Sequence, residues 1–212
     1  MERYHFACKF AKNRSILDIA CGVGYSAPLF IQAGAISYDG VDLNEKRVTY
    51  ASHAYGSDQI KFFIGDICFY KSGKTYDMIT CYETIEHVEN YESALKNLYS
   101  LLKPGGMLFI SSPNRLVTSP RALHLHHKPA NEFHTQEFTP EELLVQLLNA
   151  GFIAGSDDIY GQRLRRQRYS NIFMRILHRV LFNPDNRTSP AVTSIGFKLP
   201  RYFIIVATKN ND

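Results

Sequence analysis

The sequence predicts an α/β fold built on a doubly wound, mostly parallel sheet, and three successive patterns favour this class. An apolar run at 15–20 is typical of a buried strand, and it leads into the glycine turn Cys21-Gly-Val-Gly24. A helical pattern follows over Tyr25–Ala33, and a second strand pattern over Tyr38–Asp42 ends in an aspartate. Strand, turn, helix and strand form a βαβ unit, the building block of parallel sheets.

The glycine turn and the aspartate together indicate a nucleotide site. Gly22 and Gly24 let the backbone turn sharply and approach a ligand closely. Asp42 lies eighteen residues after Gly24, where a carboxylate can bind a ribose diol. The spacing Gly22-x-Gly24-x-x-Ala27 also fits the dinucleotide fingerprint, so an NAD-binding oxidoreductase is one alternative.

Asp18 favours a different nucleotide. It lies within the first strand, four residues before Gly22 and close to where a pyrophosphate would bind. A carboxylate there repels phosphates, but it suits a ligand that carries an ammonium and a sulfonium. S-adenosylmethionine has both charges, together with ribose and adenine, and it has no phosphate.

On these residues the chain resembles the class I S-adenosylmethionine-dependent methyltransferases, whose glycine motif is similar to LDIACGVGYSA at 17–27. The segment Gly65-Asp-Ile67 follows the apolar run Ile60–Ile64, where the family places an acid or amide against the adenine amino group. Tyr76–Cys81 resembles the fourth strand, and Leu102–Ile110 resembles the turn into the fifth. The resemblance covers Tyr4 to Phe152 in the family's order.

The resemblance implies a Rossmann-like methyltransferase fold, with a seven-stranded, mostly parallel sheet and an antiparallel C-terminal hairpin. It implies S-adenosylmethionine as the cofactor, lying across the carboxyl ends of the first strands. The cofactor-binding residues expected from it are Asp18, Cys21, Gly22, Gly24, Tyr25, Asp42, Leu43, Asp66, Ile67, Tyr82 and Glu83.

The last two predicted strands, Phe152–Tyr160 and Arg201–Ala207, enclose a long basic insertion at 161–200. Within the insertion, apolar residues recur at helical spacing between Tyr169 and Leu181, and arginines occupy the other side. Three interpretations stay open: a helix packed on the domain, a lid over the acceptor site, or docking on a membrane surface or nucleic acid. Nucleic acid is disfavoured, because no interleaving of aromatic and basic residues of the RNA-binding type occurs elsewhere.

The segment after the fourth strand carries the candidate catalytic residues. If Cys81–Val88 turns helically, Glu83, Glu86 and His87 share one face at spacings i, i+3 and i+4. With His134 from a later loop they offer four ligands for a divalent cation such as magnesium. Alternatively, His87 is a general base, or the acids only favour a helix N-terminus.

The ExxEH motif with a distant histidine is similar to two subgroups of the family, the small-RNA 2′-O-methyltransferases and the O-methyltransferases of ubiquinone biosynthesis. This likeness implies metal-assisted methylation of adjacent hydroxyls, with His87 and His134 in catalytic roles. The run RYHFACKFAKNRSILDIACGVGYS most resembles bacterial methyltransferases of sugar and glycan pathways, so we expect a sugar, glycan or other small-molecule hydroxyl as the acceptor. A small-molecule N- or C-methyltransferase and a non-catalytic binding domain stay as alternatives.

Composition sets the remaining expectations. With 212 residues, of which 45% are hydrophobic, we expect one methyltransferase domain over 1–212. The four cysteines have no CxxC spacing, which favours small core residues in a reducing compartment over disulfides or a zinc site. His124, His126 and His127 are expected in an exposed loop. We find no signal peptide and no membrane-spanning segment, which favours the cytoplasm.

Overall fold

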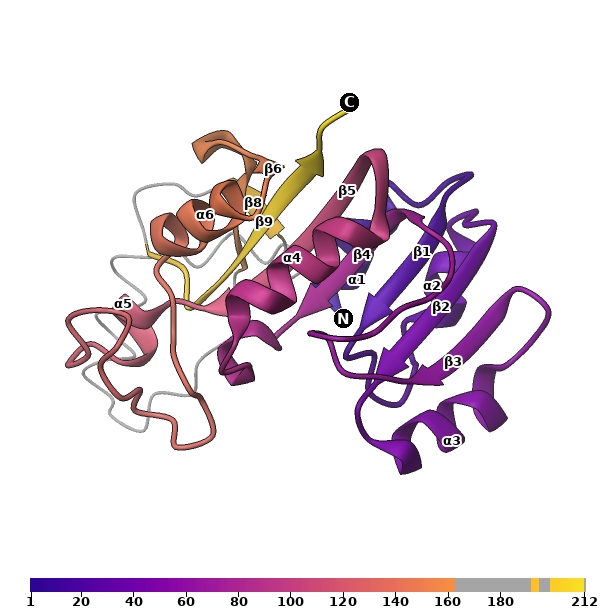
Figure 1. The fold of residues 1–212 in the computed structure, drawn as a ribbon, viewed down its shortest axis with the longest axis horizontal. Helices are drawn as coiled ribbons and strands as arrows, with labels where there is room; N and C mark the ends of the chain where they lie inside the picture. Colours follow the sequence, from indigo (N-terminus) through magenta and orange to yellow (C-terminus); the bar gives the residue numbers. More distant parts are fainter. Residues whose placement is uncertain (163–191, 195–198, 212) are drawn as a thin grey trace, which may run out of the picture.

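The computed structural model describes residues 1–162, 192–194 and 199–211, and it contains one large mixed sheet (Figure 1). Five parallel strands form one half: β1 (Ser15–Ile19), β2 (Ser37–Asp42), β3 (Ile60–Ile64), β4 (Tyr76–Tyr82) and β5 (Leu102–Pro113). The order across the sheet is β3-β2-β1-β4-β5-β9-β7-β8, with β6 also paired to β9. The order reverses direction at β1, so a crevice forms where β1 and β4 end.

The other strands are antiparallel: β6 (Phe152–Ile153), β7 (Ile159–Gln162), β8 (Val192–Ser194) and β9 (Tyr202–Lys209). The helices are α1 (Glu2–Cys8), α2 (Ala27–Gln32), α3 (Glu45–Tyr55), α4 (Tyr91–Leu101), α5 (Arg115–Thr118) and α6 (Pro140–Asn149), with short 3-10 turns η1 (Ile85–His87) and η2 (Ser156–Asp158).

Helices cover both faces of the sheet, which confirms the doubly wound α/β prediction. On one face, alternate strand residues such as Leu17 and Ile79 pack with the apolar sides of α4 and α6. On the opposite face, Ile16 and Met78 pack with α1 and α2 around Phe30. Because strand side chains alternate, neighbouring residues of one strand belong to two separate cores.

The start of α6 illustrates how the sequence fixes a helix boundary. The Thr139 side chain accepts a hydrogen bond from the Glu142 backbone, and the Glu142 carboxylate accepts one from the Thr139 backbone. This capping box satisfies two backbone donors that a helix N-terminus leaves unpaired. Thr139 is therefore the N-cap residue, and the helix begins at Pro140.

The core between α1, α2 and the sheet contains one buried acid, Asp18. Its Oδ2 accepts hydrogen bonds from the hydroxyls of Ser26 (2.7 Å) and Tyr38 (2.8 Å). Its Oδ1 accepts from the hydroxyls of Thr80 (2.6 Å) and Tyr4 (3.3 Å). The four donors come from the first residue before α2, from β2, from β4 and from α1, so this carboxylate connects four elements to β1.

The C-terminal hairpin is antiparallel, but its first strand differs from the prediction. The expected strand Phe152–Tyr160 consists of two short strands, β6 and β7, which both pair with β9 and are separated by η2. Gly155, Ser156 and two aspartates interrupt the strand, because such residues favour turns. Together with β8, this split brings the described sheet to nine strands, against the seven predicted.

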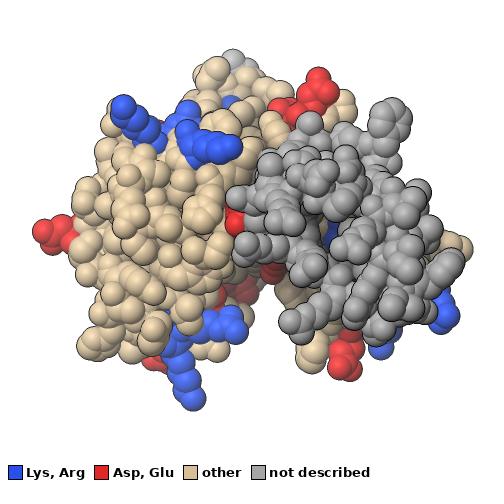
Figure 2. Space-filling model, turned by 180° about the vertical axis from the view of Figure 1, so that it is seen from behind, with Lys and Arg blue, Asp and Glu red and all other residues tan. Residues whose placement is uncertain are grey.

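The predicted basic helix of the insertion falls on residues 163–191, outside the described residues. Within 161–200, β8 pairs with β7, so the insertion also contributes a strand, which its basic, helical pattern did not predict. On the side of the molecule in Figure 2, Lys and Arg side chains of the described residues form small separate groups. Because the predicted helix lies outside the described residues, the lid, surface-helix and docking interpretations stay predictions.

Smaller expectations compare as follows. The second helix begins at Ala27 instead of Tyr25, because the glycine turn extends to Ser26. All four cysteines are free. Among the described residues, the helices are too short and too polar to cross a membrane.

Replacing Tyr38 by Phe should lower the free energy of unfolding by about 1–2 kcal/mol, since it removes one donor from a buried carboxylate. Urea denaturation of the Tyr38→Phe variant measures this loss. Tyr50→Phe is the matched control, because Tyr50 is 56% exposed on α3 and should change stability by no more than about 0.5 kcal/mol. Equal stabilities of the two variants would contradict the role given to the Asp18 hydroxyl cluster.

Candidate active site

Two cavities lie at the carboxyl ends of the parallel strands, and Glu83 lines both of them. The first, of about 300 Å³, is bounded by the glycine turn, the end of β4 and the start of α1. The second, of about 400 Å³, is bounded by η1, the end of β5, α5 and the loop before α6. Glu83 has φ = 50°, a left-handed conformation that is uncommon for a residue with a side chain and that is often found at functional sites.

The glycine turn forms the floor of the first cavity. Gly22 has φ = 60°, and a Cβ at this position would meet no atom within 4 Å. The absence of a side chain therefore leaves open space that a ligand can occupy against the backbone. Gly24 has a different reason: with φ = 76°, its Cβ would lie 2.6 Å from the Phe62 ring.

Asp42 connects the glycine turn to the second strand. Its Oδ2 accepts a hydrogen bond from the Gly22 backbone nitrogen at 2.9 Å, and its Oδ1 accepts one from the Asn44 backbone nitrogen at 2.9 Å. Both oxygens are thus held in place, and each keeps a further lone pair for a diol.

The predicted adenine contacts lie at the ends of β2 and β3. The Gly65 backbone nitrogen donates to the Asp42 carbonyl, which joins the two strand ends. Asp66 Oδ1 accepts from the Cys68 nitrogen at 2.7 Å, Ile67 is buried, and Leu43 is 70% exposed. These three residues do not line the first cavity, and neither do Gly24 and Asp42. The predicted cofactor residues that line it are Cys21, Gly22, Tyr25, Tyr82 and Glu83.

Asp18 lies beneath the site and does not line it. The side chain is completely buried, and its four hydroxyl partners satisfy both carboxylate oxygens. Burial raises the pKa of Asp18, and the four hydrogen bonds oppose that rise. From the sequence we expect this carboxylate beside the ammonium of the cofactor. In the structure it instead binds hydroxyls from the elements that surround the cavity.

Arg3 is a site residue that the sequence analysis missed. Its Nη1 lies 3.0 Å from Glu83 Oε1 and 3.2 Å from Ser111 Oγ, and its Nε donates to Gln162 Oε1 at 2.6 Å. It is the only cationic side chain among the described residues that line the first cavity. Its side-chain partners lie just after β4, in β5 and in β7, far from Arg3 in the sequence, so no local spacing indicated them.

The second cavity forms because the loop before α6 attaches to η1. The Thr135 and Gln136 backbone nitrogens donate to the Glu86 carbonyl at 2.9 and 3.3 Å. The Gln136 side chain donates to the carbonyls of Ile85 and Val88 at 2.8 and 2.9 Å. Gln136 is thus a second residue that the sequence analysis missed, and its side chain brings the loop to the end of β4.

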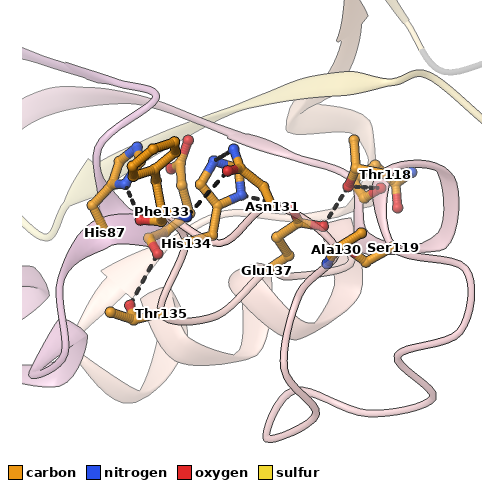
Figure 3. A network of polar contacts seen from close by, with 11 residues as sticks. His87, Thr118, Ser119, Ala130, Asn131, Phe133, His134, Thr135 and Glu137 are labelled. Atoms are coloured by element: carbon orange, nitrogen blue, oxygen red, sulfur yellow. Dashed lines mark hydrogen bonds and ion pairs between the residues drawn. The ribbon is translucent and has the colours of Figure 1, made fainter.

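This attachment brings two predicted histidines together, with ring centres 4.8 Å apart (Figure 3). His87 Nδ1 lies 2.8 Å from the Phe133 carbonyl, and His134 Nδ1 lies 2.6 Å from a Glu137 carboxylate oxygen. A carbonyl only accepts, so the proton of His87 is on Nδ1 and its Nε2 has the free lone pair. Glu137, which is 1% exposed, is the third residue missed by the sequence analysis.

Three of the four predicted metal ligands come together. One ligand atom each from Glu86, His87 and His134 lie within 4.8 Å of one another. Glu86 is buried, and its Oε2 has no hydrogen-bond partner among the described residues. Burial and the nearby Glu83 carboxylate raise the pKa of Glu86 well above its ordinary value.

Glu83 is outside this group. The predicted helical turn begins only at Ile85, as η1, because the left-handed conformation of Glu83 interrupts it. The Glu83 carboxylate instead accepts from Ser111 Oγ at 2.9 Å and pairs with Arg3. Burial raises the pKa of Glu83, and the Arg3 guanidinium opposes that rise.

The second histidine cluster, His124, His126 and His127, lies in the loop between α5 and α6. The rings of His124 and His127 are 3.5 Å apart, and the Leu123 nitrogen donates to His127 Nδ1. No acid or cysteine joins them in a metal-binding group among the described residues.

Comparisons with known proteins support this picture. The chain is 36% identical over 107 residues to a ubiquinone biosynthesis O-methyltransferase of Coxiella burnetii, covering 49% of this chain and 45% of that protein. It is 30% identical over 141 residues to a probable S-adenosylmethionine-dependent methyltransferase of Mycolicibacterium smegmatis, covering 66% of this chain and 52% of that protein. The chain thus spans about half the length of these curated relatives.

A solved structure shares the fold over nearly the whole chain. An S-adenosylmethionine-dependent methyltransferase from Mesorhizobium loti matches with a TM-score of 0.66 and 16% identity, covering 98% of both chains. The methyltransferase domain family model matches residues 2–154, which include the glycine turn, Asp42 and the segment from Glu83 to His134. This match favours the methyltransferase prediction over the dehydrogenase alternative, and since it covers well over half of the sequence, the chain belongs to the methyltransferase domain family.

Proposed function

We propose that this chain transfers a methyl group from S-adenosylmethionine to a hydroxyl of a sugar, glycan or other small molecule that carries two neighbouring hydroxyls. The observation that carries the proposal is the pair of cavities that meet at Glu83: one is built on the glycine turn, and the other contains two imidazoles and a buried carboxylate. Such a pairing suits a cofactor on one side and a polar acceptor on the other.

The chain's residues fit the cofactor at both of its ends. Asp42 would accept from the ribose hydroxyls, and Asp66 would meet the adenine amino group. Arg3 would bind the carboxylate of the methionine part, since opposite charges attract strongly in a half-buried site. When bound, the cofactor supplies a methyl group on a sulfonium, which is already reactive toward an oxygen nucleophile.

The residues of the second cavity have two tasks, orientation and proton removal. The walls of the cavity would align the acceptor oxygen with the methyl group. An acceptor hydroxyl must also lose its proton, and His87 Nε2 offers a free lone pair for it.

A divalent cation such as magnesium would serve the same end, and Glu86, His87 and His134 would hold it. The unpartnered Glu86 Oε2 supports this part of the proposal, because a buried carboxylate oxygen without a donor is costly unless something binds it. Both imidazoles also direct Nδ1 to an acceptor, which is the usual arrangement behind metal-ligating histidines. The cation would supply Lewis acidity that favours ionisation of a bound diol.

Replacing Asp42 by Ala should weaken binding of both S-adenosylhomocysteine and 5′-methylthioadenosine by about 30- to 150-fold, equivalent to about 2–3 kcal/mol. Both ligands contain the ribose diol, so both lose the same contact. Isothermal titration calorimetry measures the two affinities. The control Asp58→Ala changes an exposed aspartate and should leave them unaltered; wild-type affinity in Asp42→Ala would refute the ribose assignment.

Replacing Arg3 by Met should weaken the binding of S-adenosylhomocysteine by about 10- to 100-fold. Binding of 5′-methylthioadenosine should be unchanged, because this ligand lacks the amino acid group. The same titrations, with the exposed Lys12→Met as control, distinguish a carboxylate contact from general damage to the cavity. An equal loss for both ligands would contradict the role proposed for Arg3.

Chelation by EDTA should reduce turnover of a vicinal-diol acceptor by at least about 100-fold and leave S-adenosylhomocysteine affinity unchanged. Glu86→Gln should mimic chelation, whereas Glu89→Gln, an exposed change in the same segment, should not. Methyl transfer is measured with acceptors bearing vicinal hydroxyls, single hydroxyls or amines. Full activity in EDTA together with a mild Glu86→Gln phenotype would exclude the cation and leave His87 as the base; preference for an amine would favour N-methylation.

A further inference from the structure

The imidazole of His134 is held from behind by a buried acid. Glu137 Oε1 lies 2.6 Å from His134 Nδ1, and the other carboxylate oxygen contacts the Thr118 hydroxyl of α5 (Figure 3). The Glu137 side chain is almost completely buried, so this carboxylate has few alternatives to these two partners. A carboxylate only accepts, which favours the His134 tautomer with its proton on Nδ1.

The other side of the ring gives an independent argument for the same tautomer. Asn131 Oδ1 accepts a hydrogen bond from the Phe133 backbone nitrogen at 3.1 Å, which fixes the orientation of the amide. The amide nitrogen therefore faces His134 Nε2, at 2.8 Å. An amide nitrogen only donates, so Nε2 must accept, and the single proton of the neutral ring must be on Nδ1.

We propose that Glu137 is a positioning residue that keeps the His134 proton on Nδ1, and that Asn131 covers the Nε2 lone pair until a cation or an acceptor hydroxyl replaces it. This inference rests on the proposed function, in which Nε2 of His134 is the nitrogen that faces the chemistry. Glu137 then determines that Nε2 is the His134 nitrogen with a lone pair for the ligand. Asn131 occupies this lone pair until the ligand binds.

A purely structural role for Glu137 explains less. The loop is already attached to η1 through the backbones of Thr135 and Gln136 and through the Gln136 side chain, none of which involves Glu137. The buried acid contributes instead to the direction and protonation of one ring. In this arrangement Asn131 donates to the one lone pair of His134 that Glu137 leaves free.

Long-range proton–nitrogen NMR of ¹⁵N-histidine-labelled protein tests the tautomer directly. The spectra are recorded at pH about 8.5, well above the ordinary histidine pKa of about 6.5. The signals of His134 are assigned by their loss in His134→Gln. The wild type should show a protonated Nδ1 and a bare Nε2, and Glu137→Gln should keep this pattern because its amide oxygen can still accept. Combining Glu137→Met with Asn131→Ala removes both the acceptor at Nδ1 and the donor at Nε2, so this double variant should shift the ring toward protonated Nε2. Asn131→Ala alone should keep the wild-type pattern, because Glu137 still accepts the proton.

Function gives a second readout. Glu137→Met should lower kcat by about 10- to 100-fold with unchanged S-adenosylhomocysteine affinity, and Glu137→Gln should recover most of the loss. Glu132→Met makes the same chemical change at an exposed position in this loop and should be neutral. Asn131→Ala should raise the affinity for added magnesium or manganese by about 5-fold, since the cation no longer displaces a hydrogen bond.

The NMR result separates this inference from the proposed function. Protonated Nε2 in the wild type, or an unchanged tautomer in a folded protein carrying both Glu137→Met and Asn131→Ala, would overturn the inference whatever the activity. The expected tautomers in a protein that methylates none of the acceptors would refute the proposed function and leave the assignment of the His134 proton standing. Weaker cation binding by Asn131→Ala would overturn the role given to Asn131.

Discussion

The buried carboxylate of Asp18 is the interaction on which the cofactor half of the site depends. A charge taken out of water is costly unless donors surround it, and here four hydroxyls from α1, β2, β4 and the start of α2 do so. Satisfying one acid thus fixes four elements relative to β1. Because Tyr4 is one of the donors, the neighbouring Arg3 is brought over the first cavity.

The acceptor half of the site is built differently. Its residues come from η1, the end of β5 and the loop before α6, and backbone hydrogen bonds to the Glu86 carbonyl join this loop to η1. Strand ends thus supply a rigid cofactor cavity, while loops supply the groups that would meet the acceptor. Glu83 lies where the two halves meet. Its left-handed backbone conformation turns the chain away from the end of β4, two residues before η1 begins.

The second cavity gathers groups that would be unfavourable together without a ligand. Three acids, Glu83, Glu86 and Glu137, line one space with two imidazoles and Arg201. Arg3 pairs with Glu83, and His134 contacts Glu137, whereas Glu86 Oε2 has no such partner among the described residues. Two of the acids thus hold their neighbours, and Glu86 is the one with an unpartnered oxygen.

The sequence by itself determined the fold class, the glycine turn and the strand-end acids Asp42 and Asp66, because these follow from local periodicity and from short-range spacing. The ExxEH spacing also predicted Glu86 and His87 as site residues, and both line the second cavity. Tertiary structure alone decided that Asp18 lies beneath the cavity instead of lining it, that Glu83 lies outside the predicted metal-ligand group, and that Arg3, Gln136 and Glu137 join the site. Each of these depends on contacts between segments far apart in the chain, and spacing within one segment carries no information about them.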